Sequence, residues 1–174
     1  MDAIEAIHTR RSIRKYTDRP VPRELVTEML RAAMSAPSAV NAQPWAFIVI
    51  DDRKILEEIP TFSPYAGMCR DAPLAILVCG DTTLEKVPGY WVQDCSAATQ
   101  NLLLAAHACG LGAVWTGIYP MKDRVEGFRK TFGLPEHIIP LALVPVGYPD
   151  QEPGQQDRFD RKKIYYNTYG KREE

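Results

Sequence analysis

Four nearly continuous apolar runs divide the chain. They cover residues 45–52, 73–81, 113–120 and 140–149, and β-branched and aromatic residues are frequent in them. Strands that are apolar without alternation are usually covered on both faces of their sheet. The pattern therefore predicts a central sheet with helices packed on both sides.

Helical periodicity occupies the segments between these runs. Helices are predicted at residues 2–9, 22–36, 52–59, 91–109 and 121–134. Pro22 suits the first turn of the second helix and Pro37 ends it. Gly110 stops the helix at 91–109, and Gly133 is the predicted C-cap of the last one. The order helix-helix-β-α-β-α-β-α-β predicts an α/β or an α+β sandwich.

The composition changes after Pro149. Residues 150–174 are polar and charged, yet they hold Phe159, Tyr165, Tyr166 and Tyr169, side chains that require a surface to pack on. We therefore predict one domain over residues 1–174, whose last part, 150–174, is an extended arm that docks on a partner subunit.

Composition and charge narrow the class of protein. The 174 residues are enough for one domain with its own core, and the 45% hydrophobic and 25% charged residues are ordinary for a globular protein. The formal net charge is −1, which argues against a protein that lives on nucleic acid. The acidic, amphipathic N-terminal stretch predicts no signal peptide, and no apolar run predicts a membrane span, so we expect a cytoplasmic protein with neither nucleic acid nor membrane as a partner.

Several kinds of chemistry find no support in the sequence. The cysteines at 69, 79, 95 and 109 form no CxxC, so we expect buried, free thiols in a reducing compartment and no metal site. No histidine lies near a GxSxG, which argues against a catalytic triad. The glycines in "GLGAVWTG" and "CGDTTLEK" lack the context of a Rossmann or a phosphate-binding loop. We therefore assign no catalytic side chain.

A cluster of cations lies in "TRRSIRKY", residues 9–16. On a helix end, Arg10 and Arg14 at i, i+4 spacing would point the same way. Together with Arg11 and Ser12 they could hold a phosphate through forked, charge-assisted hydrogen bonds. The alternative is an ordinary solvated basic stretch.

A second candidate is the loop from Ser35 to Trp45. Pro37 and Pro44 stiffen it, and its polar side chains, Ser38, Asn41 and Gln43, offer donors and acceptors just before a buried strand. Such a loop could bind a flat polar ring. The alternative is a simple helix-to-strand connection.

The two motifs together resemble the nitroreductase family of FMN-dependent oxidoreductases. "RRSIRKY" matches the family pattern R-R-S-x-R-x-[FY], and "APSAVNAQPW" (36–45) matches A-P-S-x-x-N-x-Q-P-W. Residues 97–120, 141–149 and 157–169 resemble the family's central helix with its glycine strand, its last core strand and its C-terminal arm. The resemblance spans nearly the whole chain.

The resemblance implies an α+β fold with a mostly antiparallel sheet of four to five strands flanked by helices, and a C-terminal arm exchanged in a homodimer. It also implies FMN as cofactor and NAD(P)H as reductant. A small-molecule electron acceptor such as a nitroaromatic or a quinone would follow in a ping-pong mechanism. Alternatives are a reductive dehalogenase or flavin-modifying enzyme on the same fold, or a non-enzymatic anion-binding domain.

The family's site residues can be carried over by position. Arg10, Ser12 and Arg14, helped by Arg11, would bind the phosphate and ribityl end, and Arg158 would return to the phosphate from the arm. Phe159 replaces a second basic residue of the family, so Arg161 or Lys163 would substitute. The loop at residues 60–73 would cover the ring through side chains that the resemblance does not identify. The remaining contacts would come from Pro37, Ser38, Ala39, Asn41 and Gln43 of the partner subunit, and from Trp115, Thr116 and Gly117, where a backbone N–H would meet flavin N5.

Overall fold

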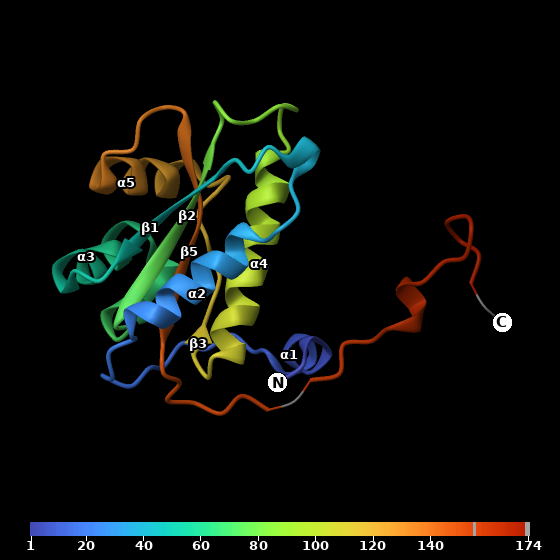
Figure 1. Cartoon of the computed structure of the whole chain (residues 1–174), viewed down its shortest axis with the longest axis horizontal. Helices are drawn as coiled ribbons and strands as arrows, with labels where there is room; N and C mark the ends of the chain where they lie inside the picture. Colours follow the sequence, from blue (N-terminus) through green and yellow to red (C-terminus); the bar gives the residue numbers. More distant parts are fainter. Residues whose placement is uncertain (155, 173–174) are drawn as a thin grey trace.

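A computed structural model describes residues 1–154 and 156–172 of the chain (Figure 1). Its helices are α1 (Ala3–Thr9), α2 (Arg23–Met34), α3 (Arg53–Phe62), α4 (Trp91–Ala108) and α5 (Lys122–Phe132). Its strands are β1 (Trp45–Ile50), β2 (Leu74–Asp81), β3 (Gly112–Ala113), β4 (Thr116–Gly117) and β5 (Ile138–Gly147). Short 3₁₀ turns follow at η1 (Ala39–Asn41), η2 (Pro64–Arg70) and η3 (Arg161–Lys163).

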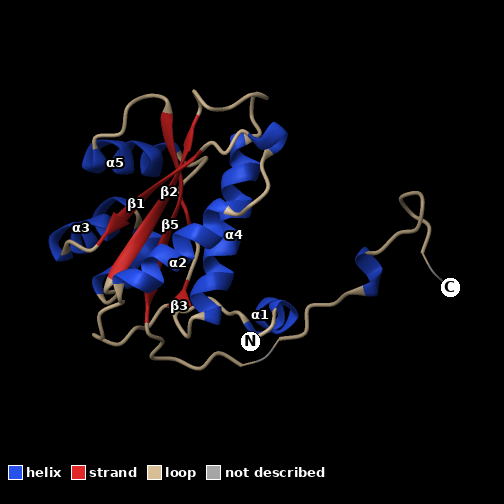
Figure 2. Cartoon of the chain, viewed as in Figure 1, coloured by secondary structure: helices blue, strands red, loops and turns tan. Residues whose placement is uncertain are grey.

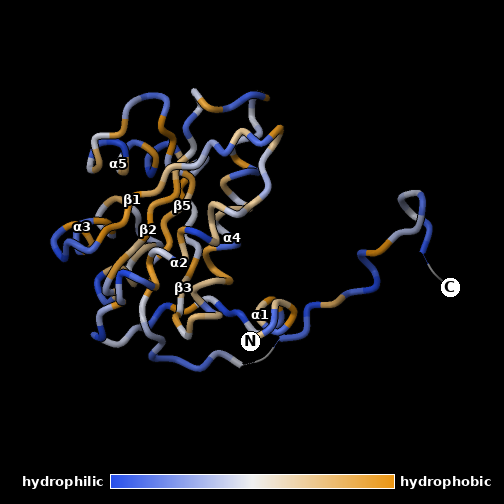
Figure 3. Tube along the Cα trace, in the orientation of Figure 1, coloured by the Kyte–Doolittle hydropathy of each residue, from blue (hydrophilic) through white to orange (hydrophobic). Residues whose placement is uncertain are grey.

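The five strands form one antiparallel sheet between two layers of helices (Figure 2). Its order is β1-β2-β5-β3, and β4 also pairs with β5. Successive side chains of β2 point to opposite faces. Ile76 and Val78 pack against α2 and α4, whereas Ala75 and Leu77 pack against α3 and α5. The expectations of a mostly antiparallel sheet, and of strands covered on both faces, are confirmed. Figure 3 shows this apolar centre between more polar helices.

The third predicted strand, residues 113–120, is broken into β3 and β4. Ala113 pairs with Val146 and Thr116 with Leu143, so Val114 lies opposite Pro145. The N–H of Val114 reaches the carbonyl of Pro145 at 3.4 Å. Proline has no N–H to return the second hydrogen bond of this pair, and the ladder is interrupted there. The apolar run did not distinguish one long strand from two short ones.

The cationic segment lies against the end of the sheet. α1 ends at Thr9. The chain then forms a bridge from Ser12 to Ala113 of β3 and another from Tyr16 to Pro149, two residues after β5. Ile13 is buried and donates its N–H to Ala113 at 3.0 Å. A Cβ on Gly112 would lie 2.5 Å from a methyl carbon of Ile13. Glycine is therefore what allows this segment to approach the sheet so closely.

The C-terminal arm projects from the body of the chain (Figure 1). Residues 156–163 and 167–172 are exposed, including Phe159 at 69% and Tyr169 at 90%. These aromatic side chains gain little packing from their own chain. The docking of the arm on a second subunit stays a prediction.

Candidate functional site

The segment that carries the arginines is extended rather than helical. Arg10 already has φ −56° and ψ 130°, so the helical i, i+4 argument for Arg10 and Arg14 is wrong. Extended backbone places alternate side chains on one side. Residues 10, 12 and 14 can therefore still share a side, opposite buried Ile13. The two-residue period of an extended chain therefore supports the grouping of Arg10 with Arg14 that was first inferred from a helix.

The positive charge around Arg10 is not neutralised within the described chain. Burial, followed by the nearby charges of Arg11 and Arg158, lowers the pKa of Arg10. Across residues 1–154 and 156–172, ion pairs join only Arg31 to Glu28 and Arg53 to Glu57. In that same part of the chain, the guanidinium groups of Arg10 and Arg14 have no hydrogen-bond partner. Clustered cations with free donors suit a phosphate group, so these residues fit the phosphate of FMN.

The guanidinium of Arg11, unlike those of Arg10 and Arg14, forms hydrogen bonds within the chain. Its guanidinium donates to the carbonyl oxygens of His8 at 2.7 Å and Arg10 at 2.8 Å, which closes the end of α1. It also donates to Gly154 at 3.3 Å and Gln156 at 3.5 Å, where the arm begins. Its donors are thus used by backbone, and in this arrangement Arg11 contributes charge to the cluster. Direct contact of Arg11 with a phosphate stays a prediction.

The loop after α2 is held in a strained conformation. Val40, Asn41 and Gln43 have φ values of 46°, 54° and 50°, in the left-handed region that non-glycine residues avoid. Such residues cost about 1–3 kcal/mol each, and they persist only where surrounding contacts fix them. They cluster at functional sites more often than elsewhere, which supports the choice of this loop as part of a binding site.

A buried carboxylate that the sequence analysis missed helps to fix this loop. Asp94, on α4 and only 5% exposed, accepts the N–H of Ala39 at 2.9 Å. The hydroxyl of Ser38 accepts the N–H of Gln43 at 2.9 Å, and the Gln43 amide donates to Asn41 at 3.1 Å. An acid inside an otherwise apolar helix was the available signal for Asp94. Pro37 precedes this hydrogen-bonded turn.

The cationic segment and the strained loop lie at opposite ends of α4 (Figure 1). Thr9, next to Arg10, contacts His107 at 2.7 Å, while Ala39 contacts Asp94 at 2.9 Å. The span from residue 94 to residue 107 is about 20 Å along the axis, at ~1.5 Å per residue. A single chain therefore does not bring Arg10 and the loop together.

β3 lies at the end of α4 next to the cationic segment, through the bridge of Ser12 to Ala113, and β4 follows it along β5. Trp115 is half-buried, and the buried Thr116 hydroxyl donates to the Leu143 carbonyl at 2.9 Å. Gly117 is exposed, and no atom lies within 4 Å of where its Cβ would be. This opening leaves its backbone accessible to a ligand. The Gly117 carbonyl accepts a hydrogen bond from Arg124 at 2.7 Å, a contact that the charge pattern of α5 did not reveal.

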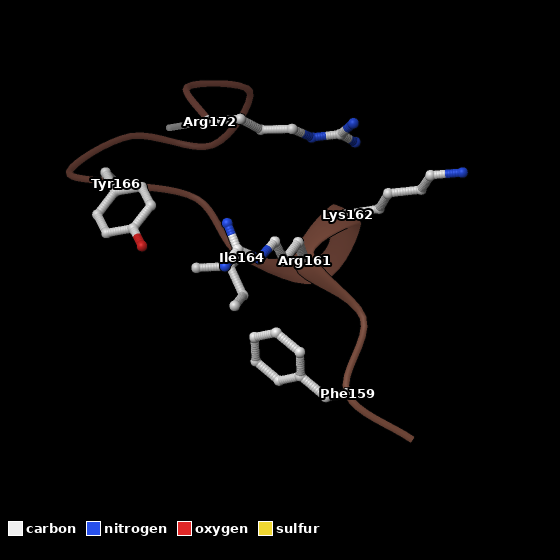
Figure 4. Close-up of a pocket in the computed structure, with 6 residues that line it drawn as sticks. All are labelled: Phe159, Arg161, Lys162, Ile164, Tyr166 and Arg172. Carbon is white, nitrogen blue, oxygen red and sulfur yellow. The ribbon is translucent and has the colours of Figure 1, made fainter. Parts of the chain in front are cut away.

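The basic residues of the arm are divided between two places. Arg158 influences Arg10, and its guanidinium donates to the side chain of Gln156 at 3.1 and 2.7 Å. Arg161 lies farther along, in a hollow made only by arm residues (Figure 4). The lining consists of Phe159, Arg161, Lys162, Ile164, Tyr166 and Arg172. A second phosphate contact by Arg161, or by Lys163 in its place, stays a prediction.

The cysteines and acidic side chains of the described residues form no second candidate site for catalysis or metal binding. Cys69, Cys79 and Cys95 are buried and unpaired, and burial raises the pKa of each to about 12. Cys109, expected to be buried, is only partly so. In residues 1–154 and 156–172, no three His, Cys, Asp or Glu side chains gather as metal ligands would. No helix in this part of the chain is long and apolar enough to cross a membrane.

Comparison with known proteins defines the class. The chain has an α+β fold with an antiparallel sheet, and the model of the Nitroreductase family matches its residues 7–63 and 63–148. The chain belongs to the nitroreductase family, so the resemblance drawn from its motifs is confirmed.

Individual relatives support this assignment. A protein of Methanothermobacter thermautotrophicus, provisionally named an NADH dehydrogenase/NAD(P)H nitroreductase, is 60% identical over 97% of this chain and 88% of its own. A structure from Parabacteroides distasonis with the same provisional name has a TM-score of 0.92 and 46% identity, covering 95% of this chain and 98% of that one. A nitroreductase from Desulfovibrio desulfuricans, also provisionally named and solved in complex with FMN, has a TM-score of 0.86 and 32% identity, over 97% and 99% of the two chains.

Proposed function

We propose that the protein is a cytoplasmic FMN-dependent oxidoreductase that takes a hydride from NAD(P)H and reduces an electron-poor acceptor such as a nitroaromatic or a quinone. One observation carries this proposal: an unneutralised cationic cluster at Arg10 lies on the same sheet edge as the open backbone of Gly117, within a nitroreductase fold. The printed names of the relatives and the FMN complex of one neighbour support it. Four unpaired cysteines are in keeping with a reducing compartment.

The proposal gives each part of the chain a task. Arg10, Ser12 and Arg14 would hold the FMN phosphate, and Arg158 would add charge from the arm. When bound, FMN supplies the hydride chemistry, while the protein supplies binding, orientation and electrostatics. The backbone of β4, at Thr116 and Gly117, would orient the ring through an N–H. Trp115, which packs against the core between the sheet and α4, would support the adjoining β4.

A second copy of the chain would complete the site. The strained loop, with Pro37, Ser38, Ala39, Asn41 and Gln43, is about 20 Å from Arg10 along α4, so it would serve the FMN of a partner. Apolar side chains of α1 and α2 stand exposed beside α4, namely Ile4, Ile7 and Met34. A homodimer that buries them and exchanges the arms would account for both features.

One slot would serve both substrates. The sequence has no separate dinucleotide-binding motif, so the nicotinamide and the acceptor would occupy the same position in turn. Initial rates over a grid of both substrates test this ping-pong scheme. Parallel double-reciprocal lines agree with a shared slot, and intersecting lines would contradict it.

Titration of the apoprotein with FMN tests the phosphate assignment. Arg10→Ala and Arg14→Ala should each lose a charge-assisted hydrogen bond of about 1.5–3 kcal/mol, which is roughly ten- to a hundredfold in Kd. Arg31→Ala is the matched control, because it removes an arginine whose exposed pair with Glu28 contributes little. Wild-type affinity in both site variants would refute the assignment. A colourless protein that takes up no FMN would favour an anion-binding domain, and an acceptor panel would separate a dehalogenase from a nitroreductase.

A further inference from the structure

Arg124 joins three parts of the chain that are distant in sequence. It belongs to the first turn of α5, its Nη1 donates to the Gly117 carbonyl of β4 at 2.7 Å, and its guanidinium lies 4.9 Å from the ring centroid of Tyr65 in η2. Tyr65 is 71% exposed, so this contact lies at the surface. Within the proposed function, the backbone of β4 would orient the flavin ring, and the family resemblance expects the loop at residues 60–73, which contains η2, to cover that ring. Arg124 is thus located where those two elements meet.

Most hydrogen-bond donors of the Arg124 guanidinium remain available in this position. Arginine has five N–H donors, and the hydrogen bond to Gly117 uses one of them. The contact with the Tyr65 ring also uses the face of the guanidinium and none of its N–H donors. No carboxylate forms an ion pair with Arg124 among residues 1–154 and 156–172. A fixed, unneutralised positive charge therefore lies beside the accessible backbone of Gly117.

Flavin reduction creates the charge that such a cation would meet. A hydride from NAD(P)H carries two electrons and one proton, so a neutral flavin ring that took it up would gain one negative charge, and NAD(P)⁺ would leave. A nearby positive charge stabilises the reduced form more than the oxidised one, because only the reduced ring is anionic. A fixed charge at the end of a short helix would do this without further rearrangement.

We propose that Arg124 stabilises the reduced flavin electrostatically, as a positioning and charge-supplying residue contributed by α5. This inference rests on the proposed function, since it requires bound FMN. It assigns a role to a residue outside the motifs from which the family was recognised. It also gives Tyr65, in a loop whose contacts the sequence left open, the task of holding that cation.

The test measures the midpoint potential of bound FMN by anaerobic reduction against a reference dye. Arg124→Gln keeps a donor for the Gly117 carbonyl but removes the charge, and Arg124→Lys keeps the charge. Arg129→Gln is the matched control: Arg129 also lies on α5 and donates from Nη1 to a backbone carbonyl at 2.7 Å, but to Pro135 at the other end of the helix.

We expect Arg124→Gln to lower the affinity for reduced FMN, relative to oxidised FMN, roughly tenfold, which corresponds to about 30 mV in a two-electron potential. Arg124→Lys should retain most of the wild-type potential, and Arg129→Gln all of it. A wild-type potential in Arg124→Gln, or equal shifts in the Gln and Lys variants, would overturn the electrostatic role while leaving FMN binding intact. Absence of FMN binding in the wild type would overturn the proposed function, and this inference with it.

Discussion

Replacing Gly112 with alanine tests whether the close contact between the cationic segment and the sheet positions the arginines. The added Cβ would lie 2.5, 2.7 and 2.8 Å from Cγ2, Cβ and Cγ1 of Ile13. Rotation about χ1 could move the two γ carbons but not the Cβ. The backbone of the segment must therefore shift, and Arg10 and Arg14 lie within three residues of Ile13.

Two quantities should change together in Gly112→Ala. Overpacking of a buried site usually costs about 1–3 kcal/mol, so the urea midpoint should fall while the m value stays the same. Displacing one charge-assisted contact to phosphate should raise the Kd for FMN about tenfold or more. The first effect reports packing at β3, and the second reports the position of the arginines.

Urea unfolding of the apoprotein and FMN titration measure these effects separately. Gly154→Ala is the control, because nothing lies within 4 Å of where its Cβ would be. Unchanged stability in Gly112→Ala would refute the steric argument. Reduced stability with wild-type affinity for FMN would show that the cationic segment does not position the phosphate.

Further predictions concern Asp94, the thiols and His107. Asp94→Ala should leave the Ala39 N–H without an acceptor, which costs about 1–3 kcal/mol of stability and should weaken FMN binding. Asp94→Asn keeps an acceptor and should remain close to wild type. Equal losses in both variants would contradict the role of Asp94 in holding the loop. A thiol reagent at pH 8 should modify Cys109 alone in the native protein and all four cysteines after denaturation. A pKa of about 12 leaves the buried Cys69, Cys79 and Cys95 as unreactive thiols. Rapid modification of a second cysteine in the native protein would contradict this prediction. Burial, then Arg10 and Arg11, lowers the pKa of His107, so the folded state binds this proton less readily than the unfolded chain and stability should fall as pH drops below the ordinary histidine range. His107→Gln should flatten this part of the stability curve measured between pH 8 and 5, and superimposable curves would argue against the assignment.

The sequence was sufficient for the main features of the fold. Continuous apolar runs located the strands of a sheet covered on both faces, and helical periodicity located α1 to α5. The interruption between β3 and β4 was not visible, because it arises from Pro145 on a neighbouring strand. Such an interruption depends on pairing between distant segments, and the periodicity of one segment gives no information about it.

The candidate site was predictable in its residue types but less so in its geometry. The grouping of Arg10 with Arg14 was deduced from a helix, whereas the bridge of Ser12 to Ala113 makes the segment extended. The left-handed backbone at Val40 has no local signal, since a β-branched residue disfavours it. Arg124 could be linked to Gly117 only once α5 had been placed beside β4.

The hydrogen bonds of Arg11 have a thermodynamic consequence for the two ends of the described chain. Through its hydrogen bonds to Arg10 on one side and to Gly154 and Gln156 on the other, Arg11 connects the cationic segment to the first part of the arm. Any partner that immobilises the arm restrains the segment as well, and any anion held by the segment restrains the arm. By linkage, such coupling is reciprocal: the factor by which assembly tightens cofactor binding equals the factor by which the cofactor tightens assembly.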